Sequence, residues 1–371
     1  MSKTLQDYAT LINDTIQSNE INHYITTDNM CQNLGGIDTF KNINIPQGKV
    51  RSFQKDDVLL SNIRLYFRKV YRAKQKGGCS SDVLVFRAKH IDSATLFAIL
   101  SSQIFTDYAC SGSQGSKMPR GNKTHMMDFK IPTINFTIAK IFNSIQNKIE
   151  NNHKINELLH KILELLYEQY FVRFDFLDEN NKPYQTSGGK MKFSKELNRL
   201  IPNDFEVKTL GELTQLKVGN KNANHSSNQG KYPFFTCSNN PLKCETYQFE
   251  GKHIIISGNG NFYVTHYDGK FDAYQRTYVV NPNNPNHYVL IYLFVKSYTN
   301  YLKLQSRGSI IKFITKSDIE NIKIVLPNLK TCTKWNNVLK MIENNNQSTQ
   351  TLTALRDFLL PLLLKQQVKP Q

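Results

Sequence analysis

The sequence lacks the cysteine pattern of a disulfide-stapled or zinc-ribbon protein. Its 371 residues include six cysteines, and none forms a Cys-x-x-Cys pair. Cys237 and Cys244 are close in sequence but have no histidine beside them, so their spacing argues against a zinc site. Scattered cysteines in a chain of this length are typical of reduced, buried thiols. We therefore expect no bound metal and a cytoplasmic location.

Long apolar runs are also missing. No run reaches the length that spans a bilayer, and no signal peptide is recognisable in the opening "MSKTLQDYATL". The run "DFLLPLLL" at 357–364 is short and contains Pro361, which predicts a packed helix end. We expect a soluble intracellular protein.

Acidic residues are scarce relative to basic ones. The chain has 47 Lys and Arg against 30 Asp and Glu, a formal net charge of +17. A hydrophobic fraction of 39% with 22 Phe indicates a folded protein. An excess of positive charge on a folded protein favours nucleic acid as the partner. The alternative is a basic, solvated surface in a proteome rich in Lys, Asn and Ile.

Recognisable catalytic motifs are absent from the sequence. "GSQGSK" at 112–117 is too short between its glycines for a phosphate loop and is soon followed by proline. "SGNGNF" at 257–262 is half of a dinucleotide fingerprint and is better explained as a turn between strands. "SNNPLK" at 238–243 lacks the second proline and the aromatic ring of an amino-methyltransferase site. We therefore expect a binding protein with no catalytic residues.

What the sequence does contain is an internal repeat. "KTLQDYATL" at 3–11 returns as "KTLGELTQL" at 208–216. Gly115-Ser116 returns as Gly308-Ser309, and "IENN" recurs at 149 and 342, both 193 residues later. An ordered series of matches along both halves indicates duplication.

Each half begins with strand-like runs of β-branched and aromatic residues and ends with a long helical pattern. The strand-like runs are 57–67, 81–88, 253–257 and 276–280, and shorter helices are expected at 93–102 and 286–298. The predicted class is α+β: two sheet-rich mixed α/β globules separated by two long antiparallel coiled-coil helices, with a pseudo-two-fold repeat. The predicted domains are 1–133, the helix 134–176, a polar connector 177–201, a second globule 202–327 and a distal helix 328–371.

The helical patterns, 137–171 and 333–366, repeat apolar residues every seven positions, which is typical of coiled coils. Asn152 and Asn156 in one seam, with Asn345 in the other, can fix the register of the pair. Two amphipathic helices of a compact bundle are the alternative, but they need a globular core around them. The seam residues expected at the pairing and docking surface are Phe142, Ile145, Ile149, Leu159, Leu166, Trp335, Val338, Ile342, Leu352 and Leu359.

Basic residues gather in a few segments of each half, where they can neutralise phosphates or reach base edges. A solvated charged face explains many such residues individually. The DNA-binding candidates are Arg64, Arg68, Lys69, Lys117, Arg120, Lys123, Lys221, Lys231, Arg276, Arg307 and Lys312.

The chain resembles the specificity (S) subunit of type I restriction–modification systems over essentially its whole length. The resemblance lies in "YITTDNM", "DDVLLSNIRLYFRKV", "GGCSSDVLVF" and "GSKMPRGNK" of the first half, and in "YPFFTCSN", "GKFDAYQRTYVV" and "GSIIKFITKSDIENIKIVLP" of the second. It implies two target recognition domains that each read half of a split double-stranded DNA site. It also implies helices that set the spacer and dock two DNA methyltransferase (M) subunits, with restriction (R) subunits added for cleavage.

The resemblance places S-adenosylmethionine and ATP in the partner subunits and leaves this chain without a cofactor. Base-contacting residues diverge within the family, so the DNA-binding candidates rest on charge and loop position. A stand-alone, viral or orphan DNA-binding protein on the same scaffold, without modification partners, is the second interpretation. A structural helical protein with incidental charge is the third.

Overall fold

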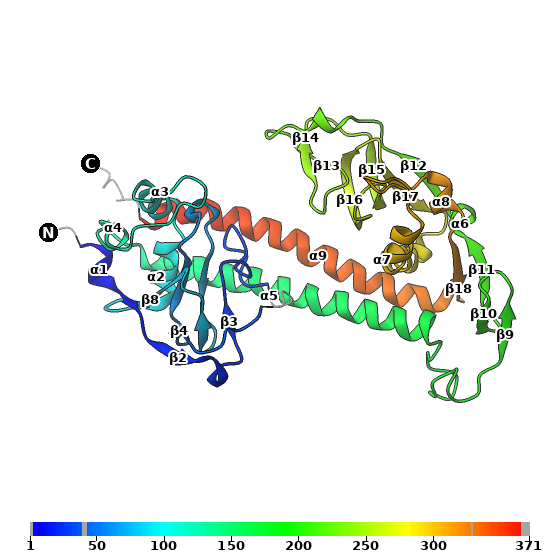
Figure 1. The fold of residues 1–371 in the computed structure, drawn as a ribbon, viewed down its shortest axis with the longest axis horizontal. Helices are drawn as coiled ribbons and strands as arrows, with labels where there is room; N and C mark the ends of the chain where they lie inside the picture. Colours follow the sequence, from blue (N-terminus) through cyan, green and yellow to red (C-terminus); the bar gives the residue numbers. More distant parts are fainter. Residues whose placement is uncertain (1–2, 39–42, 132, 328, 365–371) are drawn as a thin grey trace. The chain divides into compact units, whose positions relative to one another are not determined.

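The structure is a computed structural model that describes residues 3–38, 43–131, 133–327 and 329–364 (Figure 1). The chain divides into two compact units, Met1–Lys154 with Asn345–Gln371, and Ile155–Asn344. Each unit therefore contains one sheet-rich globule and a portion of both long helices. The predicted α+β class is confirmed, whereas the five predicted domain boundaries stay a prediction. No helix of the described residues is long and apolar enough to cross a membrane.

The globule of the first unit contains two four-stranded sheets. The first has the order β1 (Ala9–Ile12), β8 (Val83–Ala88), β5 (Val58–Ser61), β6 (Val70–Arg72), and the second β2 (Thr15–Gln17), β4 (Lys49–Phe53), β7 (Gly77–Cys79), β3 (Tyr24–Ile25). Four short helices complete the globule: α1 (Leu5–Tyr8), α2 (Ser93–Leu100), α3 (Gln103–Ser111) and α4 (Lys123–Met127). The buried helix α2 joins the core built around Leu84 and Phe86 of β8.

The globule of the second unit is built on one six-stranded sheet. Its order is β12 (Thr214–Val218), β17 (Thr277–Pro282), β15 (Phe249–Ser257), β16 (Val264–Ala273), β13 (Tyr232–Phe235), β14 (Leu242–Cys244). The helices are α6 (Leu210–Leu213), α7 (Tyr288–Gln305) and α8 (Lys316–Glu320), and β11 (Glu206–Thr209) pairs with β18 (Lys323–Leu326). The predicted connector contains part of an antiparallel hairpin, β9 (Met191–Ser194) with β10 (Arg199–Pro202).

The predicted internal repeat is confirmed element by element. The order β1-β8-β5-β6 returns as β12-β17-β15-β16. Helix α8 begins and ends 193 residues after α4. Thr4 pairs with Lys130 in the first unit as Thr209 pairs with Lys323 in the second. Because strand order, helix position and strand register all repeat, the two halves share one core arrangement.

The predicted strand 57–67 is correct only as far as Ser61. Beyond it the chain turns through Arg64 and Arg68, whose φ angles of 51° and 48° are left-handed, around a short 3-10 helix, Leu65–Phe67. A strand cannot continue through residues with positive φ. The other predicted strands overlap β8, β15 and β17, and the helices expected at 93–102 and 286–298 overlap α2 and α7.

The two long helices are α5 (Phe136–Tyr167), which continues into a π-helical turn, Glu168–Val172, and α9 (Leu329–Leu359), followed by a 3-10 turn, Leu360–Leu363. They pair antiparallel within each unit. In the first unit Asn152 Nδ2 donates to Thr349 Oγ1 at 3.1 Å, and in the second unit Asn156 Nδ2 donates to the Ile342 carbonyl at 3.3 Å. The buried seam asparagines are thus confirmed. The end of the predicted distal helix, 365–371, lies outside the described residues.

The helices are built into the core of each globule. Phe142 of α5 packs against Phe97 of α2 in the first unit, with ring centroids 5.5 Å apart. In the second unit Leu163 and Trp335 join the core of α7 and the sheet. The sequence alone did not predict this core around the helices. The seven-residue repeat of apolar residues does not show which strands and short helices pack against it. The packed helix end predicted at Pro361 is confirmed by the buried Leu363.

Candidate nucleic-acid interface

An exposed loop follows the core helices of the first unit, and we call residues 114–120 the first basic loop. Gln114 and Arg120 close it with two backbone hydrogen bonds, each 2.9 Å from nitrogen to oxygen. Gly115 takes a φ of +97°, a conformation that side chains disfavour. Lys117 lies exposed at the tip. Asn122 then caps α4 through its side chain.

The second basic loop, residues 307–313, repeats this construction in the second unit. Arg307 and Phe313 exchange backbone hydrogen bonds of 3.0 and 2.9 Å. Gly308 has the same φ of +97°, and a Cβ there would lie 2.3 Å from a backbone oxygen. Thr315 caps α8 as Asn122 caps α4. The glycine conformation and the closing backbone hydrogen bonds are therefore the same in both basic loops. Lys312 is exposed near the tip of the second basic loop.

Most of the predicted DNA-binding residues are accessible. Arg120 and Arg307 are exposed but form ion pairs with Asp82 and Asp318, at 3.0 and 3.2 Å. Exposed pairs of this kind contribute about 0–1 kcal/mol, so a phosphate can compete for the guanidinium. The other accessible candidates are the exposed Lys117, Lys123, Lys231, Arg276 and Lys312, and the half-buried Lys221.

Three candidates are instead engaged within the first globule. Arg64 and Arg68 donate to the backbone carbonyls of Lys117 and Ser101. Lys69 donates to the Thr27 carbonyl. Burial lowers the pKa of Arg68, although the charge of Asp357 opposes the shift. A DNA-binding role for these three stays a prediction, and the structure gives each of them a packing role.

The carboxylate beside the second basic loop is held ionised. Burial of Asp318 acts to raise its pKa, but hydrogen bonds from Thr315 and the charge of Arg307 outweigh that effect and lower the pKa. The ionised Asp318 caps α8 and orients Arg307. The contact between Asp318 and Arg307 fixes the start of the second basic loop, whereas the tip of the loop stays exposed.

The predicted docking residues of the helices are buried or half-buried within the units. A fully buried side chain cannot contact a partner protein. The docking role of these residues stays a prediction. Sequence analysis missed a second apolar stripe, which follows the same seven-residue repeat on an adjoining face of α5 and α9. Its members are 38–69% exposed: Ile155, Leu158, Ile162 and Leu165 on α5, and Leu355, Phe358 and Leu362 on α9 and the turn after it. We call these two sets the outer stripes.

Two positions of the outer stripes match across the internal repeat. Ile162 and Leu165 correspond to Leu355 and Phe358 at the offset of 193. Each set lies in a different unit, so each unit carries one. Exposed apolar residues at helical spacing are typical of a surface that a protein partner covers.

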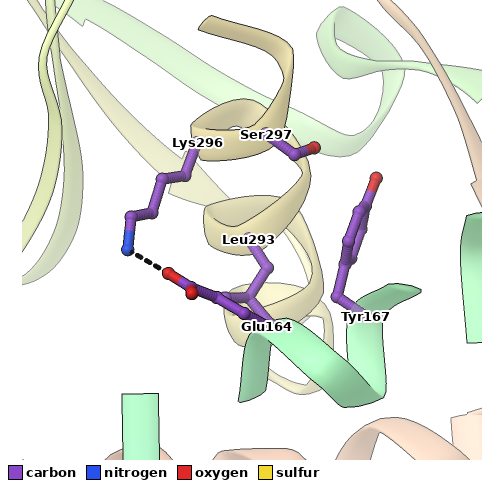
Figure 2. A pocket seen from close by; sticks show the side chains of 5 residues that line it. All are labelled: Glu164, Tyr167, Leu293, Lys296 and Ser297. Atoms are coloured by element: carbon purple, nitrogen blue, oxygen red, sulfur yellow. Dashed lines mark hydrogen bonds and ion pairs between the residues drawn. The ribbon is translucent and has the colours of Figure 1, made fainter. Parts of the chain in front are cut away.

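A separate pocket of about 230 Å³ lies between α5 and α7 of the second unit (Figure 2). Glu164, Tyr167, Leu293, Lys296 and Ser297 line it. Lys296 Nζ donates to Glu164 Oε1 at 2.8 Å, the dashed contact in Figure 2.

Cys244 has a histidine neighbour in the structure that its sequence spacing does not predict. The structure brings His225 and Asp272 to Cys244, all three ligand atoms lying within 4.8 Å of one another. The histidine lies 19 residues before the cysteine, a spacing outside the familiar zinc motifs. The sheet, which pairs β13 with both β14 and β16, brings the three segments together.

Comparisons with known proteins agree with this duplicated, basic architecture. Residues 202–355 match the family model described as the type I restriction modification DNA specificity domain. The resemblance expected from the sequence is therefore confirmed, with the family match lying over residues 202–355.

Two relatives and one solved structure extend the match. A 132-residue segment is 37% identical to the Type I restriction enzyme EcoDI specificity subunit of Escherichia coli, covering 34% of this chain and 28% of that protein. The chain is 24% identical over 301 residues to the MjaIX specificity subunit of Methanocaldococcus jannaschii, covering 72% and 67%. The fold is similar to the type I S subunit from M. genitalium, with a TM-score of 0.63 at 16% identity over 99% and 96% of the chains.

Proposed function

We propose that this chain is the non-catalytic DNA-recognition subunit of a type I restriction–modification enzyme that acts in the cytoplasm. Each sheet-rich globule reads one half of a bipartite double-stranded DNA target. The observation that carries the proposal is the duplication of the exposed basic loop 114–120 as 307–313, with the same closing pair and the same glycine conformation. Two copies of one presenting element are what a target with two halves requires.

The charge of the accessible residues supports DNA as the ligand. Lys117, Lys123 and Lys312 carry ammonium groups on or beside the loops, and the chain as a whole carries +17. Lysines of this kind contact phosphates and orient the protein on the duplex.

The tips of both basic loops also expose apolar side chains. Met118 and Ile311 are 53% and 61% exposed at equivalent positions of the repeat, and Ile310 is 95% exposed. An apolar side chain flanked by cations can contact a thymine methyl group or wedge between base pairs. The tips therefore supply a contact with the bases that the lysines alone lack.

The outer stripes support docking of two copies of one partner. Because Ile162 and Leu165 correspond to Leu355 and Phe358, a surface that recognises one stripe can recognise the other. The proposed partners are two DNA methyltransferase subunits, which bind S-adenosylmethionine and methylate a flipped adenine. Restriction subunits, which use ATP, join the complex for cleavage. The two long helices set the unread spacer between the half-sites.

The test is to co-express the chain with a type I DNA methyltransferase subunit and to map methylated adenines by single-molecule sequencing. The proposal predicts a motif of two specified segments separated by a spacer of fixed length. Methylation without a bipartite motif would contradict it. Tight, salt-sensitive binding of the isolated chain to duplex DNA, without capture of a methyltransferase, would favour the stand-alone interpretation.

A further inference from the structure

Three side chains of metal-binding type converge in the second globule, outside the basic loops and the outer stripes. They are His225 at the end of a 3-10 turn (Ala223–His225), Cys244 at the end of β14, and Asp272 in β16. His225 Nε2, Cys244 Sγ and a carboxylate oxygen of Asp272 all lie within 4.8 Å of one another. Nitrogen, thiolate sulfur and carboxylate oxygen are the donors that zinc takes in proteins.

The carboxylate of Asp272 is buried and incompletely satisfied. Its side chain is fully buried, as is that of Cys244. Asp272 Oδ2 accepts a hydrogen bond of 2.6 Å from Thr246 Oγ1 and lies 3.2 Å from His225 Nε2. Oδ1 is buried and has no hydrogen-bond partner among the described residues. An unpaired buried carboxylate oxygen is costly, and a bound cation removes that cost.

The surrounding chain holds the three ligands in place. The ring of His225 packs edge-on against the buried Phe234, with centroids 5.4 Å apart. Phe234 is paired with Asp272 in the parallel ladder of β13 and β16. Gly230 lies so close to Cys244 that a Cβ at Gly230 would come within 2.4 Å of the Cys244 backbone. The ligands therefore belong to a packed part of the globule.

We propose that His225, Cys244 and Asp272 form a zinc-binding site, with water completing the coordination. Tetrahedral zinc with bonds of about 2.0 Å to nitrogen and oxygen and about 2.3 Å to sulfur needs ligand atoms roughly 3.3 to 3.6 Å apart. Ligand atoms up to 4.8 Å apart must therefore approach one another by at most about 1.5 Å to bind the ion. The Cys244 thiol loses its proton to solvent as the zinc–sulfur bond forms.

The ion cross-links three segments that are far apart in sequence. The ion joins the turn before β13 to β14 and to β16. It therefore stabilises a part of the six-stranded sheet whose counterpart in the first globule belongs to a separate sheet. In the first unit the corresponding parallel pair is Tyr24 with Gly78, so a glycine stands where the second unit has Asp272. The site is thus specific to the second globule.

The test uses the full chain, stripped with chelator and titrated with Zn²⁺ and with Co²⁺. We expect one equivalent of Zn²⁺ per chain, and with Co²⁺ a near-ultraviolet charge-transfer band that reports thiolate ligation. Cys244→Ser should abolish the band. Loss of a residue that only hydrogen-bonds a metal ligand weakens metal binding by roughly 10- to 100-fold. Asp272→Asn should weaken zinc binding by more than that, because Asp272 is a ligand itself. Cys237→Ser is the matched control and should leave both readouts unchanged.

Two outcomes would overturn the proposal. One is a wild-type chain that takes up no stoichiometric Zn²⁺ and shows no thiolate band with Co²⁺, a result that needs no variant to interpret. The other is a folded Cys244→Ser chain that binds zinc as tightly as wild type. In either case the three residues form only a hydrogen-bonded cluster. Neither result bears on DNA recognition, because the titration contains no DNA and no partner subunit.

Discussion

Removing one outer stripe should detach one methyltransferase copy. The double substitution Ile162→Ala/Leu165→Ala removes two of the four outer-stripe side chains of α5, the two that the repeat matches on α9, without touching the seam that packs α5 against α9. Leu355→Ala/Phe358→Ala is the equivalent change on α9. Each double variant should reduce the complex from two methyltransferase copies to one.

The size of the effect follows from the exposure of these side chains. Ile162 and Leu165 are 45% and 55% exposed. Full burial of such a side chain is worth about 1.5–3 kcal/mol, so covering the exposed half of each contributes about 1 kcal/mol. Two residues then contribute about 2 kcal/mol, a loss of about 30-fold in affinity at that site. Phe358, which is 69% exposed, makes the loss at the other site slightly larger.

Sedimentation velocity and titration calorimetry measure the stoichiometry and the affinity together. At a methyltransferase concentration about tenfold above the wild-type Kd, each double variant should bind one copy where wild type binds two. The control is Phe193→Ala/Leu200→Ala, which removes two exposed apolar residues paired across β9 and β10. The outer stripes are not the docking surface if both double variants bind two copies with unchanged affinity. The same conclusion follows if the control variant loses as much affinity for the methyltransferase as the double variants do.

Three further predictions concern DNA binding and stability. Lys117→Ala and Lys312→Ala should each lower the slope of log K against log salt by about 0.9, measured by fluorescence anisotropy of a labelled duplex, because each removes one phosphate contact. Arg68→Ala should leave that slope unchanged and instead lower the free energy of unfolding by about 2 kcal/mol in a denaturant titration, since its hydrogen bond to a carbonyl is partly buried. Burial, aided by the positive charges of neighbouring basic groups such as Lys252 and Lys296, lowers the pKa of His266 to about 4. The unfolded chain takes up this proton below about pH 6.5, whereas the folded chain does so only near pH 4. As the pH falls from about 6.5 to about 4, the free energy of unfolding should therefore fall by up to about 3 kcal/mol. His266→Gln should flatten this pH profile in thermal melts.

The repeat was predictable because duplicated positions keep both their residue types and their spacing. The sequence matches at offsets 193 and 205 align the segments that hold α4 and α8, and α1 and α6, although the sequence did not show that these segments are helical. The long helices were predictable for a similar reason, since a seven-residue period survives whatever packs against it.

Features that depend on tertiary contacts were not predictable. Arg68 looks like any other basic residue in sequence, yet the left-handed turn at 64–68 directs its side chain to the Ser101 carbonyl. The outer stripe at 155–165 has the same period as the buried seam, and sequence periodicity does not distinguish a packed face from an exposed one. Likewise, Asp272 lies near Cys244 because β13 pairs with both β14 and β16, a pairing that the sequence does not show.

Exchange of one globule tests the central claim, that each globule reads one half of the target. Residues 202–327 are replaced by the corresponding segment of another specificity subunit, and methylated adenines are mapped by single-molecule sequencing in cells that also express the methyltransferase. We expect one half of the motif to change while the other half and the spacer length stay as in wild type. An unchanged motif, or a change in both halves at once, would contradict the account.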